Sequence, residues 1–308
     1  MSKVVDFNEG IYKYLNIKSL GLPTSDYFYK DKKETSIWFK GKEGLRPVDF
    51  LKGVFETNGV MFARKFNESV SGDGNESEKN YAIKSSSLCA LLFFYNVSND
   101  NPIIYKGIKY TKVYFEVKNK VNIRPSNMDV VLVGTKERDD DSILFIESKF
   151  SEFIGTTKYP LGEAYKKEPF NHMFDNDVFR YDEQEIFQYG LKQLITHYIG
   201  IRNFINADMN IYKEEMKSLY KGKIGDRVHV YKKYENIGFL EIVFEMAQED
   251  DYKKYIAETK LVFESLKKEK QKDDIKLDLY GTVTYQDFFL GNNKAILDGK
   301  VKEFYKLD

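Results

Sequence analysis

Two apolar segments joined by a short polar loop place the strongest constraint on the fold of this chain. The first covers residues 125–134 and the second covers residues 142–149. The loop between them contains Gly, Thr, Lys, Glu, Arg and Asp, which favour turns and solvent exposure. Two strand-forming segments on either side of such a loop predict an antiparallel β-hairpin.

The register of this hairpin brings charged side chains together at one end. Folding about Arg138 gives the pairs Val133–Ile143, Val131–Phe145 and Asp129–Glu147. Because side chains alternate between the faces of a strand, Asp129, Glu147 and Lys149 point to the same face. Burying two carboxylates side by side costs free energy unless they pair with cations or bind a metal.

The spacing of Glu147 and Lys149 is not distinctive by itself. The chain contains eight acid-any residue-Lys triplets, which begin at Asp31, Glu116, Glu147, Glu215, Asp251, Glu258, Asp274 and Asp298. The triplet at Glu147 differs because it ends an apolar run and faces Asp129. Glu116→Gln is expected to be nearly neutral. The alternative interpretation is a surface ion pair of Glu147 with Lys149, with Asp129 in a turn.

These residues resemble the catalytic hairpin of the PD-(D/E)XK nuclease superfamily, which has the restriction-endonuclease-like fold. In that superfamily an Asp lies on one strand, and an acid-any residue-Lys triplet ends the next. Asp129, Glu147 and Lys149 match these positions. Pro125 lies four residues before Asp129 instead of beside it, so it departs from the family pattern.

The order of the expected elements agrees with this resemblance. A helix capped by Ser85–Ser87 is followed by strands at 110–121, 125–134 and 142–149, a helix at 182–204 and a strand at 238–246. The order helix, strand, strand, strand, helix, strand is that of the PD-(D/E)XK core. We therefore expect an α/β fold with a mixed sheet flanked by helices, and a restriction-endonuclease-like αβββαβ core at about 85–246.

Outside this core the sequence predicts elaborations. Residues 1–80 form an N-terminal elaboration of unknown role, and residues 81–308 form a nuclease-like domain with a C-terminal extension, as one compact unit. The expected local structures are a helix at 48–55, a flexible loop at 69–80, an amphipathic helix at 252–270 and an extended segment at 275–290.

The resemblance also implies a chemical role for each matched residue. Asp129 and Glu147 would hold Mg²⁺, with Mn²⁺ as a substitute, and the Ser148 carbonyl matches the usual third protein ligand. Lys149 would orient or activate the attacking water. Either Glu147→Ala or Lys149→Ala is expected to abolish cleavage while the protein stays folded.

In many members of the superfamily, the helix after the triplet strand carries a Gln that faces the site. Gln193 is the preferred candidate for this position, and Gln188 is the rival. Gln193 and His197 are four residues apart and therefore share a helix face. The alternative for both is a polar flank of a packed helix.

Composition and single residues exclude other classes. The 48 basic residues balance the 48 acidic ones, which argues against a protein that coats nucleic acid. The zero net charge does not exclude an enzyme that binds nucleic acid through local basic strips, for which residues 217–233 and 267–272 are candidates. No apolar run reaches about 18 residues, so we expect a cytoplasmic protein without a membrane partner. Cys89 and Trp38 are expected in the core, and 137–141 is expected as a solvated hairpin tip instead of a calcium loop. Three scattered histidines argue against structural zinc.

Together these inferences predict a metal-dependent nuclease that hydrolyses phosphodiester bonds in DNA, similar to restriction endonucleases or to recombination and phage-type exonucleases. RNA is not excluded as a substrate. The sequence also leaves undecided whether the protein forms a homodimer or acts with a partner protein. The alternative is a non-catalytic nucleic-acid-binding or protein-interaction module that retains the fold. The intact set of Asp129, Glu147 and Lys149 argues against this alternative.

Overall fold

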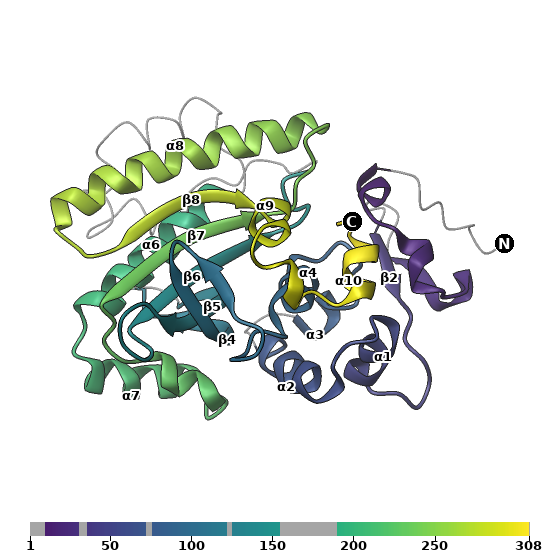
Figure 1. Cartoon of the computed structure of the whole chain (residues 1–308), viewed down its shortest axis with the longest axis horizontal. Coiled ribbons are helices and arrows are strands. Elements are labelled where there is room, and N and C mark those ends of the chain that lie inside the picture. The colour runs from purple at the N-terminus through teal and green to yellow at the C-terminus, as the bar shows by residue number, and fades with distance from the viewer. Residues whose placement is uncertain (1–9, 31–35, 72–75, 122–124, 155–189, 308) are drawn as a thin grey trace.

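A mixed six-stranded sheet with helices on both faces forms the centre of the protein (Figure 1). The computed structural model describes residues 10–30, 36–71, 76–121, 125–154 and 190–307, and the account below concerns these residues. The strands lie in the order β3 (Ile103–Tyr105), β4 (Ile108–Asn119), β5 (Ser126–Thr135), β6 (Ser142–Lys149), β7 (Asn236–Val243) and β8 (Asp278–Thr284). Pairing is antiparallel from β3 to β6 and parallel from β6 to β8. The expectation of a mixed α/β sheet flanked by helices is confirmed.

Strands β5 and β6 form the predicted hairpin in the predicted register, with Val131 opposite Phe145 and Val133 opposite Ile143. The loop between them was expected to be solvated throughout, but it is solvated only in part. Asp141 is buried, and its carboxylate accepts the backbone N–H groups of residues 136, 137 and 138 at 2.8–2.9 Å. This carboxylate therefore closes the turn, which is a correction to the expectation of a wholly solvated tip.

One face of the sheet packs on α4 (Ser86–Phe94), which the Ser85 side chain caps by accepting the Leu88 N–H. Apolar residues of β5, β6 and β7 join α4 in one core cluster. Cys89 is fully buried in this helix as predicted, and burial raises the pKa of its thiol. Other helical elements that contribute to this cluster are the 3₁₀ helices at 10–14 and 17–20, α1 (Pro47–Val54), α2 (Gly59–Ser69), α9 (Tyr285–Leu290) and α10 (Gly299–Phe304). A further 3₁₀ helix lies at 24–26 and buries none of its residues.

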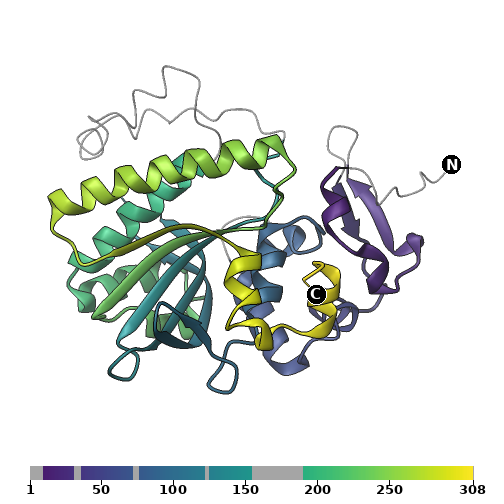
Figure 2. The same cartoon turned by 45° about the horizontal axis from the view of Figure 1, so that its top comes forward.

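The opposite face packs on α6 (Gly190–Asn206), α7 (Met209–Leu219) and α8 (Asp250–Asp273), which form the second core cluster (Figures 1 and 2). Short 3₁₀ helices at 225–230 and 294–296 complete the described elements. The first part of the helix expected at 182–204 lies outside the described residues. No described helix is long and apolar enough to cross a membrane.

An N-terminal hairpin of β1 (Tyr27–Lys30) and β2 (Ser36–Phe39) lies beside the start of α4. The Phe39 N–H donates to the Tyr81 carbonyl at 2.9 Å, and the Ile83 N–H donates to the Ile37 carbonyl at 3.1 Å. Trp38, expected in the core, is half-buried and lines a cavity, because the alternation of β2 turns its side chain away from the buried Ile37 and Phe39.

Two further expectations are wrong in part. The segment 275–290 is extended only to Thr284, where the Thr284 hydroxyl accepts the Asp287 N–H and starts α9. Within the expected loop at 69–80, residues Glu76–Lys79 form the short helix α3, and residues 72–75 lie outside the described chain. In both places a short helix follows polar residues. Such residues favour turns as well as helix starts, so the sequence pattern did not distinguish the two.

Candidate active site

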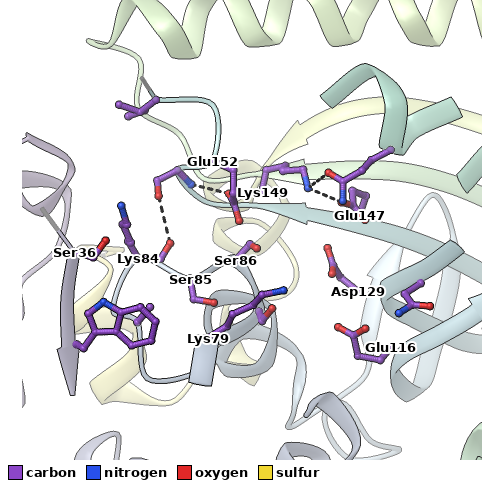
Figure 3. A pocket seen from close by; sticks show the side chains of 17 residues that line it. Ser36, Lys79, Lys84, Ser85, Ser86, Glu116, Asp129, Glu147, Lys149 and Glu152 are labelled. Atoms are coloured by element: carbon purple, nitrogen blue, oxygen red, sulfur yellow. Dashed lines mark hydrogen bonds and ion pairs between the residues drawn. The ribbon is translucent and has the colours of Figure 1, made fainter. Parts of the chain in front are cut away.

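A cavity of about 510 Å³ lies beside the ends of β5 and β6 and the first turn of α4 (Figure 3). Figure 3 shows Glu116, Asp129, Glu147 and Lys149 grouped at one side of this cavity. Gln193 from α6 also lines it. The structure therefore brings the candidate residues Asp129, Glu147, Lys149 and Gln193 together, while Gln188 lies outside the described residues.

Acidic residues form a row across four neighbouring strands. In the β4–β5 ladder, the pairs on either side of this position put Glu116 opposite Asp129. The β5–β6 register continues to place Asp129 beside Glu147. In the parallel β6–β7 ladder, Glu147 pairs with Glu241. A row of carboxylates on adjacent strands concentrates negative charge at one level of the sheet, and this charge needs compensation.

Glu147 is buried between two basic side chains. Its Oε1 lies 2.5 Å from Lys149 Nζ, and its Oε2 lies 2.8 Å from His197 Nε2. Burial alone would raise the pKa of Glu147, but the charges of Lys149 and His197 outweigh it and lower the pKa to about 2. Glu147 is 1% exposed and Lys149 is 4% exposed, so the alternative of a surface ion pair is wrong.

Asp129 has the opposite electrostatic character. It is partly exposed to the cavity and accepts the Ser148 N–H at 2.8 Å. Its desolvation, followed by the negative charge of Glu147, raises the pKa of Asp129 well above its ordinary value. Two neighbouring carboxyls with pKa values displaced in opposite directions are typical of catalytic sites.

Lys149 is held by two partners from different elements. Its Nζ donates to Glu147 Oε1 and to Gln193 Oε1, the latter at 2.8 Å. Burial lowers the pKa of Lys149, but the charges of Glu147, Glu152 and Asp129 reverse this effect and raise it above the ordinary value. Lys149 is therefore an ammonium ion at neutral pH.

Helix α6 supplies both polar partners of the hairpin, because Gln193 and His197 lie one turn apart on it. His197 also contacts Ser126, with 2.5 Å between Nδ1 and Oγ. The expected shared face is confirmed, and the interpretation as a mere polar flank is wrong for both residues. His197 is a site residue that was not predicted, although its four-residue spacing from Gln193 was the available signal.

Glu116 is the acid that the sequence analysis set aside. It is 7% exposed, lines the cavity, and has a backbone φ of 52°. Tyr114 and Val117 lie in the same core cluster, so the alternation of β4 shifts by one residue at this point. A left-handed conformation costs a residue with a side chain about 1 kcal/mol, and such strain gathers at functional sites. An acid within the apolar run 113–117 was the available signal.

The backbone at Ser148 also faces this group. The β5–β6 ladder ends beside Asp129, so the Ser148 N–H meets the Asp129 carboxylate instead of a β5 carbonyl. On the other edge of β6, the Lys149 carbonyl accepts the Phe244 N–H at 2.9 Å. Because backbone groups of successive strand residues point to alternate edges, the Ser148 carbonyl faces the side of Asp129.

The donor set fits a hard divalent cation. Among the described residues, no group of three His, Cys, Asp or Glu side chains is arranged as a metal cage. Mg²⁺ does not need such a cage, since it keeps several waters and uses one or two carboxylates. Asp129, Glu147 and the Ser148 carbonyl meet this requirement. A cation beside Asp129 would also offset the carboxylate repulsion that raises its pKa.

Glu241 is a further buried acid that the sequence analysis did not assign. It is 0% exposed, and its carboxylate accepts hydrogen bonds from the hydroxyls of Tyr255 and Thr282. Burial raises its pKa to about 7, although both hydrogen bonds act in the opposite direction. Glu241 adjoins the candidate site because it pairs with Glu147 in the parallel β6–β7 ladder.

The raised pKa of Glu241 predicts a pH-dependent stability. A raised carboxyl pKa stabilises the fold below the unfolded pKa of about 4.5, and this contribution is lost as the pH rises through about 7. Glu241→Gln should therefore gain about 2 kcal/mol relative to wild type between pH 5 and pH 8. Urea denaturation of both proteins at the two pH values measures this difference. A constant difference would show that Glu241 does not titrate in this range.

The chain was compared with models of protein families, with curated proteins and with solved structures, and none of these comparisons finds a match. The side-chain geometry of the cavity is therefore the basis for assigning a function. The observations that bear on it are the carboxylates of Glu116, Asp129 and Glu147, the ammonium of Lys149, and the cavity that they line.

Proposed function

We propose that the protein is a metal-dependent nuclease of the PD-(D/E)XK type that hydrolyses phosphodiester bonds in DNA. The observation that carries the proposal is the convergence of Asp129, Glu147, Lys149 and Gln193 on one cavity. The order of α4, β4, β5, β6, α6 and β7 supports a restriction-endonuclease-like core, since it is the order expected for that core.

Asp129, Glu147 and the Ser148 carbonyl are the proposed ligands of Mg²⁺, with Mn²⁺ as a substitute. Glu116 adds a carboxylate across from Asp129. When bound, the ion neutralises phosphate charge and lowers the pKa of a bound water. The basic partners of Glu147 keep its carboxylate ionised, which a ligand of a hard cation requires.

Lys149 acts as a positioned cation in this proposal. Because its pKa is raised, it holds its proton at neutral pH and is not a general base. Its hydrogen bonds to Glu147 and Gln193 fix the ammonium at the cavity wall. From there it orients the attacking water and stabilises negative charge that develops on the phosphoryl oxygens.

Cleavage assays test this proposal directly. Plasmid, linear duplex, single-stranded DNA and RNA are each incubated with Mg²⁺, with Mn²⁺ and with chelator. We expect metal-dependent cutting that is lost in Asp129→Asn and kept in Asp139→Asn, a matched change in the exposed loop. The comparison of plasmid with linear duplex separates endonuclease from exonuclease activity.

A variant of Glu116 extends the same assay. Its place in the cavity replaces the earlier expectation of a neutral effect, and Glu116→Gln should lower cleavage by at least about tenfold. If wild type cuts no substrate yet binds nucleic acid, the alternative of a binding module that retains the fold is supported. Sedimentation of the free protein addresses the proposed homodimer.

A further inference from the structure

We propose that the candidate active site continues into a binding site for one unpaired nucleotide, with Trp38 and Phe28 stacking its base and Lys79 and Lys84 holding its phosphate. This inference deepens the proposed nuclease function and depends on it for the identity of the ligand. It names the substrate class as nucleic acid with a single-stranded segment next to the scissile phosphate.

Two hollows meet at Trp38. The cavity of about 510 Å³ is lined by Asp129 and Glu147 and also by Trp38, Lys79 and Lys84. A second hollow of about 350 Å³ is lined by Trp38 and by Phe28, Phe39, Lys40, Glu78 and Tyr81. A chain bound at the carboxylates can therefore extend past Trp38 without leaving the concave surface.

The second hollow has the shape and chemistry of a base platform. The rings of Phe28 and Trp38 are nearly parallel, with 26° between their planes and 6.2 Å between their centroids. Phe28 is 42% exposed and is the one aromatic among the described large hydrophobic side chains that are exposed. A nucleobase that stacks on such a platform gains about 1–3 kcal/mol.

The charges along this path favour a phosphate between the acids and the aromatic pair. Figure 3 shows Lys84 on the side of the cavity away from Glu147, and Lys79 between that side and Asp129, with its side chain directed toward the acids. Lys84 is partly exposed and Lys79 is exposed. Glu78 lines the aromatic hollow and disfavours a phosphate there, so the uncharged base fits that hollow and the phosphate fits the lysines.

The platform is fixed relative to the carboxylates by backbone hydrogen bonds. Trp38 forms a bridge with Ala82, and the neighbouring backbone groups of β2 pair with Tyr81 and Ile83. Residues 81–83 lead directly into Ser85, which caps α4 at the cavity. A base bound at Trp38 therefore keeps a constant distance from the reacting phosphate.

A stacked base must be unpaired, because a paired base presents only its edges to the protein and has stacking partners within the duplex. Taking a base out of a duplex costs a few kcal/mol, which the stacking energy at Trp38 would only just offset. Single strands, overhangs and frayed ends do not carry this cost. The platform therefore favours them over blunt duplex.

Trp38 is the single tryptophan of the chain, so its fluorescence reports stacking directly. The full-length Lys149→Ala variant in Mg²⁺ is titrated with a single-stranded oligonucleotide, with a blunt duplex and with a strand of abasic sites of equal length. We expect saturable quenching by the single strand and little quenching by the other two. Equal quenching by all three, or no quenching by any, would overturn the proposal.

Binding variants give an independent measurement by fluorescence anisotropy of a labelled single strand. Phe28→Ala should weaken binding by about 5- to 100-fold, which corresponds to the stacking energy of one base. The control is Ile211→Ala, which removes another exposed apolar side chain, on α7. Unchanged affinity in folded Phe28→Ala would contradict the platform.

Neither readout requires cleavage. Cutting without Trp38 quenching would leave the nuclease function intact and reject the base platform. Quenching and Phe28-dependent binding without cutting would support the platform and reject the catalytic function.

Discussion

Lys149→Met is expected to reduce metal-dependent cleavage by at least about a thousandfold in protein that is shown to be folded. The ammonium is the positioned cation of the cavity, and removal of a group that stabilises transition-state charge costs about 10²–10³-fold, with further loss when water is no longer oriented. Methionine keeps most of the apolar stem of Lys149, so the core beneath it stays filled.

The matched control is Lys253→Met, because Lys253 belongs to another acid-any residue-Lys triplet but lies exposed on α8. It should cleave as fast as wild type. Circular dichroism and urea denaturation establish that both variants are folded. Cleavage that persists in a clean preparation of Lys149→Met would reject the assignment of this triplet, and equal loss in both variants would point to a nonspecific effect.

The hairpin was predictable because its register depends on two local rules. The polar loop fixes the turn, and the alternation of side chains then fixes which residues face each other. Asp129, Glu147 and Lys149 were therefore placed on one face before the structure was known, and the observed register agrees. The shared helix face of Gln193 and His197 was predictable for the same reason, since one helical turn is also a local property.

Features that depend on nonlocal pairing were missed. Glu116 lies opposite Asp129 only through the pairing of β4 with β5, and the local pattern of β4 does not specify that register. Glu241 lies beside Glu147 only through the parallel β6–β7 pairing, whose register follows a long crossover. Trp38 was expected in the core because it lies in an apolar triplet. Its actual position at the cavity depends on the pairing of β2 with residues 81–83, which the triplet does not reveal.

The helix at 285–290 was a local signal that was not used. Thr284 and Asp287 form the Ser/Thr-x-x-acid pattern that often starts a helix, and the Thr284 hydroxyl does cap α9. The apolar residues around it favoured an extended interpretation. This helix matters for the candidate site, because the hydroxyl of Tyr285 in α9 contacts the Ser148 hydroxyl at 2.7 Å.

Glu147→Ala is expected to destabilise the protein by about 3–5 kcal/mol, which changes the earlier expectation that this variant stays folded. Glu147 is 1% exposed and is the shared partner of Lys149 and His197, both of them buried. Removing it leaves the buried Lys149 ammonium without its counterion and the His197 ring without its carboxylate partner, and breaking a buried pair from one side carries this cost. Most single domains have only about 5–15 kcal/mol of stability to lose.

Urea denaturation of Glu147→Ala, Glu147→Gln and the exposed control Glu137→Ala measures this effect. Glu147→Gln keeps a hydrogen-bond acceptor for Lys149, so it should lose less stability than the alanine variant, while Glu137→Ala should stay within about 0.5 kcal/mol of wild type. A near-neutral Glu147→Ala would mean that Lys149 and His197 find water or other partners. If the large loss is observed, inactivity of Glu147→Ala says little about chemistry, and the catalytic assignment must be tested through Asp129 and Lys149.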